Sequence, residues 1–209
     1  MQIKIKLLAA SLLCFAISSF CQHSVLDKYK TCFDSELKEW TVSFQNFDLD
    51  KFAPSYTAGI NNVQPINTND SDFIKYVDLL RPVLSFCDDK QKFVDIYHYE
   101  MNLAKGRSKI APDNSGEQQI ILYDLQAGTE NKILLCGMTK QIQEVVWMSD
   151  TKLILAGREI EAKKKVHPLI YVVDLDKHQS AMYQTKDDHC IETTQYTSPK
   201  LRNLNYQSE

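Results

Sequence analysis

The chain has 209 residues, with 24 Lys+Arg against 27 Asp+Glu, a formal net charge of −3, 44% apolar residues and only 6 Gly and 6 Pro. This length fits one globular domain with a small appendage. The charge is spread without a basic block, which argues against a nucleic-acid or anionic-membrane partner, and the low Gly and Pro content excludes a largely disordered or fibrous chain.

The first predicted element is an export signal. Lys4 and Lys6 precede an uncharged, mostly apolar run over 7–20, which has the length of a signal-peptide core and is too short to span a bilayer. Small residues at Ser19 and Cys21 favour cleavage after Cys21, which removes residues 1–21 and leaves 22 basic and 27 acidic residues. We therefore expect a periplasmic or secreted mature chain with no transmembrane segment; a lipid-modified Cys21 and an uncleaved anchor are the alternatives.

Export affects how the cysteines are interpreted. The mature chain keeps Cys32, Cys87, Cys136 and Cys190, an even number in an oxidising compartment, which predicts two disulfides. The sequence leaves all three connectivities open. A metal site is disfavoured because the four thiols are scattered singly, without Cys-x-x-Cys spacing.

Residues 22–80 form a predicted mixed helical and irregular segment. Apolar residues recur at three- and four-residue steps over 26–40, which predicts a helix. Ser71-Asp72 offers an N-cap for a second helix over 73–80, which Pro82 ends. Between the two helices, residues 41–47 alternate weakly and predict a strand.

From residue 81 to residue 209 the apolar period changes to two, which predicts a mainly β domain followed by a C-terminal tail. Polar turns separate the runs, and the short connections favour an antiparallel meander. The predicted strands cover 83–86, 93–99, 119–124, 132–135, 144–147, 152–156, 169–174 and 180–183.

The predicted strands fall into two similar groups. Phe86 precedes Asp89 by three residues and Trp147 precedes Asp150 by three, and each group later carries a closing hairpin, at 121–125 and 171–175. This pattern, over 83–185, resembles the WD40-like β-propeller repeats of exported proteins, the group that includes the TolB translocation protein. The resemblance implies two four-stranded blade-like units.

A propeller closes with at least about four blades, and only two are found here. Two blades leave open faces and edges. We therefore expect the N-terminal segment to pack on the sheets; assembly of two chains through the open sheet edges is the alternative.

The meander also suggests a disulfide pairing. Cys136 closes the fourth strand of the first group and Cys190 follows the fourth strand of the second, so both are expected at the same end of their sheets. Cys87 follows a first strand and belongs to the other end. Because a bridge needs Cα atoms within about 7 Å, we predict Cys136 with Cys190 and Cys32 with Cys87.

No catalytic, cofactor or metal site is predicted. The sequence has no Ser on a glycine-flanked turn and no glycine-rich phosphate loop, and His189 and Cys190 point to opposite faces of an extended chain. The pairs Asp88-Asp89 and Asp187-Asp188 are interpreted as turn residues. Asp48-Leu49-Asp50 lacks the later glycine and glutamate of an EF-hand.

The remaining hypotheses concern binding. The candidate partner-binding residues lie in two long polar loops: Arg107, Lys109, Lys163, Lys164 and Lys165. The first hypothesis is an exported, non-enzymatic protein-binding or scaffold protein of the cell envelope. The second is a periplasmic inhibitor or immunity protein against a toxin or hydrolase, and the third is an enzyme that uses acidic loop residues.

Overall fold

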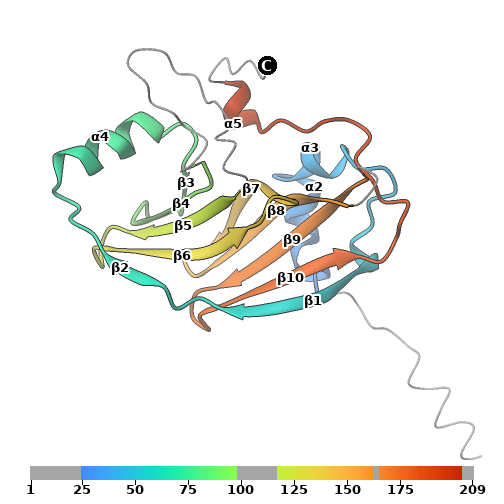
Figure 1. The fold of residues 1–209 in the computed structure, drawn as a ribbon, viewed down its shortest axis with the longest axis horizontal. Coiled ribbons are helices and arrows are strands. Elements are labelled where there is room, and N and C mark those ends of the chain that lie inside the picture. The colour runs from blue at the N-terminus through green and yellow to red at the C-terminus, as the bar shows by residue number, and fades with distance from the viewer. Residues whose placement is uncertain (1–24, 98–116, 162–164, 204–209) are drawn as a thin grey trace, which may run out of the picture.

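The computed structural model describes residues 25–97, 117–161 and 165–203, and these fold into two antiparallel sheets of five strands each (Figure 1). In the first sheet the spatial order is β2(Val63–Pro65), β6(Thr129–Cys136), β5(Gln118–Asp124), β4(Lys92–Asp95) and β3(Ser85–Phe86). In the second it is β1(Phe52–Gly59), β10(Gln179–Thr185), β9(Val166–Asp174), β8(Lys152–Ile160) and β7(Lys140–Ser149). The mainly β, antiparallel prediction is confirmed, and each of the eight predicted runs overlaps a strand.

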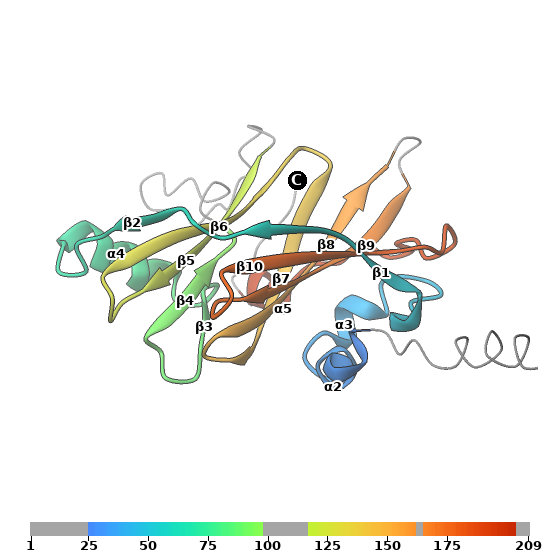
Figure 2. The ribbon, with the colours of Figure 1, turned by 90° about the horizontal axis from the view of Figure 1, so that it is seen from below.

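The N-terminal segment contributes more to the sheets than the sequence predicted. Strands β1 and β2 come from this segment, and each adds a fifth strand at the outer edge of one sheet, β1 beside β10 and β2 beside β6. Figure 2 shows the connected β1–β2 segment running along both sheets. The division at residue 80 therefore does not separate helical from β structure.

The predicted helices are formed in part. The predicted helix over 26–40 is divided into a 3-10 turn, η2(Asp27–Tyr29), and two short helices, α2(Lys30–Asp34) and α3(Lys38–Thr41). The predicted strand over 41–47 is wrong, since this stretch holds the end of α3, turns and a single bridge from Phe44 to Glu192.

The second predicted helix is confirmed as α4(Ser71–Leu80). Its N-cap is Asp70 rather than Ser71-Asp72, because the Asp70 carboxylate accepts hydrogen bonds from the N–H groups of Asp72 and Phe73. Val77 and Leu80 are the buried residues of this helix, and Pro82 follows closely after it.

The second sheet separates two hydrophobic cores, because successive side chains of a strand point to opposite faces. On β8, Leu153 and Leu155 belong to the core shared with the first sheet, whereas Ile154 and Ala156 pack against the N-terminal helices. Trp40, the largest fully buried side chain, lies in this second core. The N-terminal helices therefore cover the outer face of the second sheet, as expected.

Side chains join the two sheets at two places along β7, one beside β3 and one beside β5. The Trp147 indole N–H donates to the Ser85 carbonyl at 2.9 Å. The buried Gln118 amide reaches from β5 to the backbone of Ile142 on β7, donating to its carbonyl at 2.9 Å and accepting from its N–H at 2.6 Å. Gln118 thus takes the place of a neighbouring strand at this point of the β7 edge.

The C-terminal segment ties these layers together. The N–H of Thr193 donates to the Ser43 carbonyl at 2.8 Å, and Glu192 accepts from Arg158 at 3.1 Å. On α5(Pro199–Arg202), the Lys200 amine donates to the Ser85 hydroxyl, and burial lowers the pKa of this amine.

Gly157→Ala is expected to destabilise the second sheet by about 1–3 kcal/mol, the usual cost of overpacking. Gly157 pairs with Ile142 beside a β-bulge, and an added Cβ would lie 2.2 Å from the Gln141 carbonyl oxygen. Thermal unfolding measures the effect, with Gly137→Ala as the control because open space surrounds that position. Equal stability of the two variants would contradict the tight approach at Gly157.

Candidate functional site

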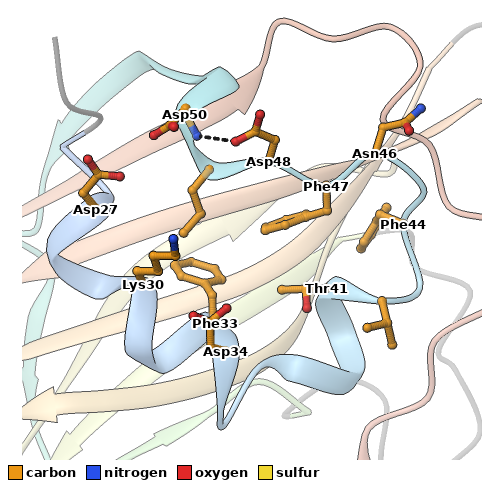
Figure 3. Close-up of a pocket in the computed structure, with 12 residues that line it drawn as sticks. Asp27, Lys30, Phe33, Asp34, Thr41, Phe44, Asn46, Phe47, Asp48 and Asp50 are labelled. Carbon is orange, nitrogen blue, oxygen red and sulfur yellow. Dashed lines mark hydrogen bonds between the residues drawn. The ribbon is translucent and has the colours of Figure 1, made fainter. Parts of the chain in front are cut away.

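An open groove lies on the N-terminal helical layer (Figure 3). It has a volume of about 930 Å³ and lies among α2, the turn after α3 and the 3-10 helix η3(Leu49–Lys51). Its lining is Asp27, Lys30, Phe33, Asp34, Thr41, Val42, Phe44, Asn46, Phe47, Asp48, Leu49 and Asp50. We call this surface the acidic groove, since it carries four aspartates and a single lysine.

The floor of the acidic groove is aromatic and tightly packed. Phe33 and Phe44 are buried and Phe47 is half-buried, and all three surround Trp40. The ring centroid of Trp40 lies 5.1 Å from that of Phe44 and 5.5 Å from that of Phe47, both in edge-to-face geometry. The floor is therefore a packed aromatic layer, in which Phe47 is the ring that stays partly exposed to the groove.

Three carboxylates gather at one end of the groove. Asp48 is the N-cap of η3 and accepts from the Asp50 N–H at 3.0 Å, which fixes the turn that carries both side chains. The negative charge of Asp27 raises the pKa of Asp50, with smaller contributions from Asp48, whereas Lys30 lowers it. The groove therefore concentrates negative charge that its own lysine does not fully balance.

Asp27→Asn is expected to lower the pKa of the Asp50 carboxyl toward its ordinary value, because the Asp27 charge is the main cause of the increase. A raised carboxyl pKa means that the native state favours the protonated form of Asp50. The repulsion between Asp27 and Asp50 therefore acts fully at a pH above the pKa that Asp50 has in the folded chain, and it is relieved as the pH falls through that pKa. NMR titration of the Asp50 side chain measures the change. Asp34→Asn is the matched control, since Asp34 lines the groove without contributing to the shift; an unchanged Asp50 titration in Asp27→Asn contradicts the coupling.

A second depression of about 880 Å³ adjoins the acidic groove and shares Asp50 with it. Here Lys51 and Asp187 form an ion pair at 2.6 Å, and the hydrogen bond from Lys51 lowers the pKa of Asp187. The Asp187 carboxylate also accepts from the His189 N–H at 2.9 Å. Its lining has three aspartates against two lysines, so this depression carries less net negative charge than the acidic groove, which has four aspartates against one lysine.

The predicted turn roles of the paired aspartates are confirmed at Asp89 and Asp187. The Asp89 carboxylate accepts from the Gln91 N–H at 2.8 Å, two residues on, just as Asp187 does from His189. Asp89, Asp150 and the Cys87 thiol are the one set of potential metal ligands among the described residues, with their ligand atoms within 4.8 Å of one another. The Cys87 thiol donates to Asp89 at 2.8 Å, so two of these three groups already bond to each other within one turn.

The four cysteines of the described residues, Cys32, Cys87, Cys136 and Cys190, are all buried free thiols, so the predicted disulfides are not formed in this structure. Cys87 and Cys136 lie in the core between the sheets, whereas Cys32 and Cys190 lie in the core under the helices. Each predicted pair therefore has its members in different cores. Burial raises the pKa of Cys190 to about 11 and that of Cys136 to about 12, which makes both thiols poor nucleophiles at neutral pH.

The predicted partner-binding loops are largely outside the described residues. Arg107, Lys109, Lys163 and Lys164 lie there, as does the predicted export signal. Lys165 is described and exposed, and its carbonyl accepts from the Glu161 N–H at 2.8 Å to close the hairpin.

No sequence pattern indicates the acidic groove. Asp48 and Asp50 match only the start of an EF-hand calcium loop, and nothing in the sequence indicates that Asp27 lies beside them.

Comparisons with protein-family models, with curated proteins and with solved structures found no match. Among the described residues, no helix has the length and apolar character needed to cross a bilayer.

Proposed function

We propose that this chain is an exported, non-enzymatic binding protein that holds a basic segment of a partner protein in the acidic groove. The observation that carries the proposal is the combination of an aromatic floor with four aspartates on one surface. Apolar floors give affinity to a docked segment, while charges at the rim select its sign and speed its association. A partner segment with Lys or Arg beside apolar side chains matches both features.

The proposed architecture is a pair of blade-like units on which the N-terminal segment is packed. Three observations support it: each sheet takes four consecutive strands in chain order, the first strands β3 and β7 meet, and Trp147 bonds to Ser85 across that junction. In this arrangement the helical layer with its groove lies on the outer face of the second unit. The sheets act as a scaffold that presents the groove.

Selection from a random displayed-peptide library tests the binding proposal. We expect the mature chain to enrich peptides in which Lys or Arg alternates with apolar residues. The double variant Asp27→Asn with Asp50→Asn is expected to bind a synthetic peptide of that composition about tenfold more weakly, since each exposed charge pair contributes up to about 1 kcal/mol.

A matched control removes the same charge elsewhere. Asp72 and Asp88 are exposed and lie outside the groove, so Asp72→Asn with Asp88→Asn is expected to retain full affinity. Enrichment of peptides without basic residues, or equal loss in both double variants, contradicts the proposal.

The export part of the proposal has its own test. Intact-mass analysis of the chain produced in a Gram-negative host is expected to show a mature protein that begins at Gln22. A chain that keeps residues 1–21 without modification contradicts it, and a lipid adduct on Cys21 identifies the lipoprotein alternative.

A further inference from the structure

The outer edge of the molecule is a single uncharged segment. Strands β1 and β2 are the outermost strands of their sheets and belong to one continuous stretch, residues 52–65, which contains no charged residue. Within 55–64 every residue except Ala58 and Ile60 is exposed, and Tyr56 and Val63 expose 61% and 53% of their surface. A charge on the edge strand is the usual protection against edge-to-edge pairing, and it is absent here.

The hydrogen bonds fix which backbone groups face outward. Ile60 N–H donates to the His178 carbonyl at 2.8 Å, and Ala58 pairs with Ser180 in the same register. Because antiparallel pairs alternate in the direction of their N–H and C=O groups, Ala58 faces β10 with its backbone while Thr57 and Gly59 face away from it. No strand of the described chain lies on that side.

Two prolines limit this edge. The same alternation places Pro54 and Pro65 at outward positions. For Pro54 it is counted from the bond between the Lys186 N–H and the Lys51 carbonyl. For Pro65 it is counted from the bond between the Ile66 N–H and the Gly128 carbonyl. Neither proline has an N–H to donate. Pairing can therefore extend only over the residues between them, which allows a short closed pair and opposes an extended fibre.

We propose that β1 of a second copy of this chain pairs antiparallel with β1, about a two-fold axis at Ala58. In that register Thr57 of each copy lies opposite Gly59 of the other, so the outward groups of both residues bond across the axis. An identical strand suits this edge because antiparallel pairing is self-complementary under two-fold symmetry. Two copies of this negatively charged chain also meet without like-charge contact along 52–65.

Site-specific oxidation tests the register. A two-fold axis at Ala58 places the two Ala58 Cα atoms about 4.5 Å apart, within disulfide range. We expect Ala58→Cys to form a crosslinked dimer under mild oxidation, while Val63→Cys, on the same edge but away from the axis, stays monomeric. The native thiols are buried and do not interfere.

Sedimentation equilibrium tests the pairing without a new thiol. The wild-type mature chain is expected to dimerise reversibly between micromolar and millimolar concentration. Thr57→Pro removes the outward N–H and is expected to weaken the dimer at least about tenfold, because one bond per copy is lost, whereas Thr57→Val keeps the N–H and the dimer.

Circular dichroism tests whether Thr57→Pro remains folded. If this variant is unfolded, Thr57→Lys is used in its place. It puts like charges on both sides of the axis and is expected to weaken the dimer by the same factor. A wild-type chain that stays monomeric throughout, equal crosslinking of both cysteine variants, or no effect of either edge variant overturns the proposal.

Discussion

Trp40→Ala is expected to lower the free energy of unfolding by about 3–5 kcal/mol, the cost of removing a large buried aromatic side chain. Trp40 is fully buried, its ring contacts Phe33, Phe44 and Phe47, and its indole N–H donates to the Gln143 amide oxygen at 3.1 Å. The substitution leaves a cavity between the helical layer and the second sheet. Urea denaturation measures the effect.

Trp40→Phe separates packing from hydrogen bonding. It keeps a ring in the core and leaves the Gln143 amide without its donor, so we expect a smaller loss of about 1–2 kcal/mol. Because Phe44 and Phe47 form the floor of the acidic groove, Trp40→Ala is also expected to weaken peptide binding under conditions where the chain remains folded. A loss of stability below about 1 kcal/mol in Trp40→Ala contradicts the role given to the helical layer.

Gln118→Leu is expected to cost about 2–4 kcal/mol, because it leaves three buried backbone groups without partners, each costing about 1–3 kcal/mol with incomplete additivity. The Gln118 amide donates to the carbonyls of Ile96 and Ile142 and accepts from the Ile142 N–H, at 2.6–2.9 Å. Leucine has nearly the same volume as glutamine. The loss of stability therefore measures the missing hydrogen bonds to the three backbone groups rather than the effect of a cavity.

The neighbouring Gln119→Leu is the matched control for this substitution. Gln119 is half-buried and pairs with Leu135 through its backbone, so its replacement is expected to stay within about 0.5 kcal/mol of wild type. Native-state hydrogen exchange at the Ile142 amide gives a local readout: protection is expected to fall in Gln118→Leu and to persist in Gln119→Leu. Equal stability of the two variants contradicts the bridging role of Gln118.

The sequence predicted the strands well because their signal is local. Short apolar runs bounded by polar residues locate each of the strands β3 to β10, and the short connections among them predict antiparallel neighbours. Strands β1 and β2 were missed because both are edge strands with mostly exposed residues, so no alternation marks them. Only the distant partners β10 and β6 determine that residues 52–65 are extended.

The acidic groove could not be predicted for a related reason. Its aspartates and phenylalanines are spread over residues 27–50, and the predicted strand over 41–47 gave that region the wrong geometry. The structure instead turns the chain after Thr41, with Asn46 at a φ of 55°, a left-handed conformation that asparagine tolerates better than most residues. That turn brings Phe44 and Phe47 against Trp40, a contact that no local pattern encodes.

The position of β1 has a consequence for how the molecule is made. Strand β1 ends at Gly59, but its partner β10 spans Gln179–Thr185, so the segment must wait until most of the polypeptide has been synthesised before it can be incorporated. Pairing of such high contact order is slow, and unpaired strands are prone to aggregation in the interval. We therefore expect the β3–β6 hairpins to form early in refolding and β1 to dock last. The delay of β1 depends on the number of residues between β1 and β10 rather than on the strand propensity of β1 itself.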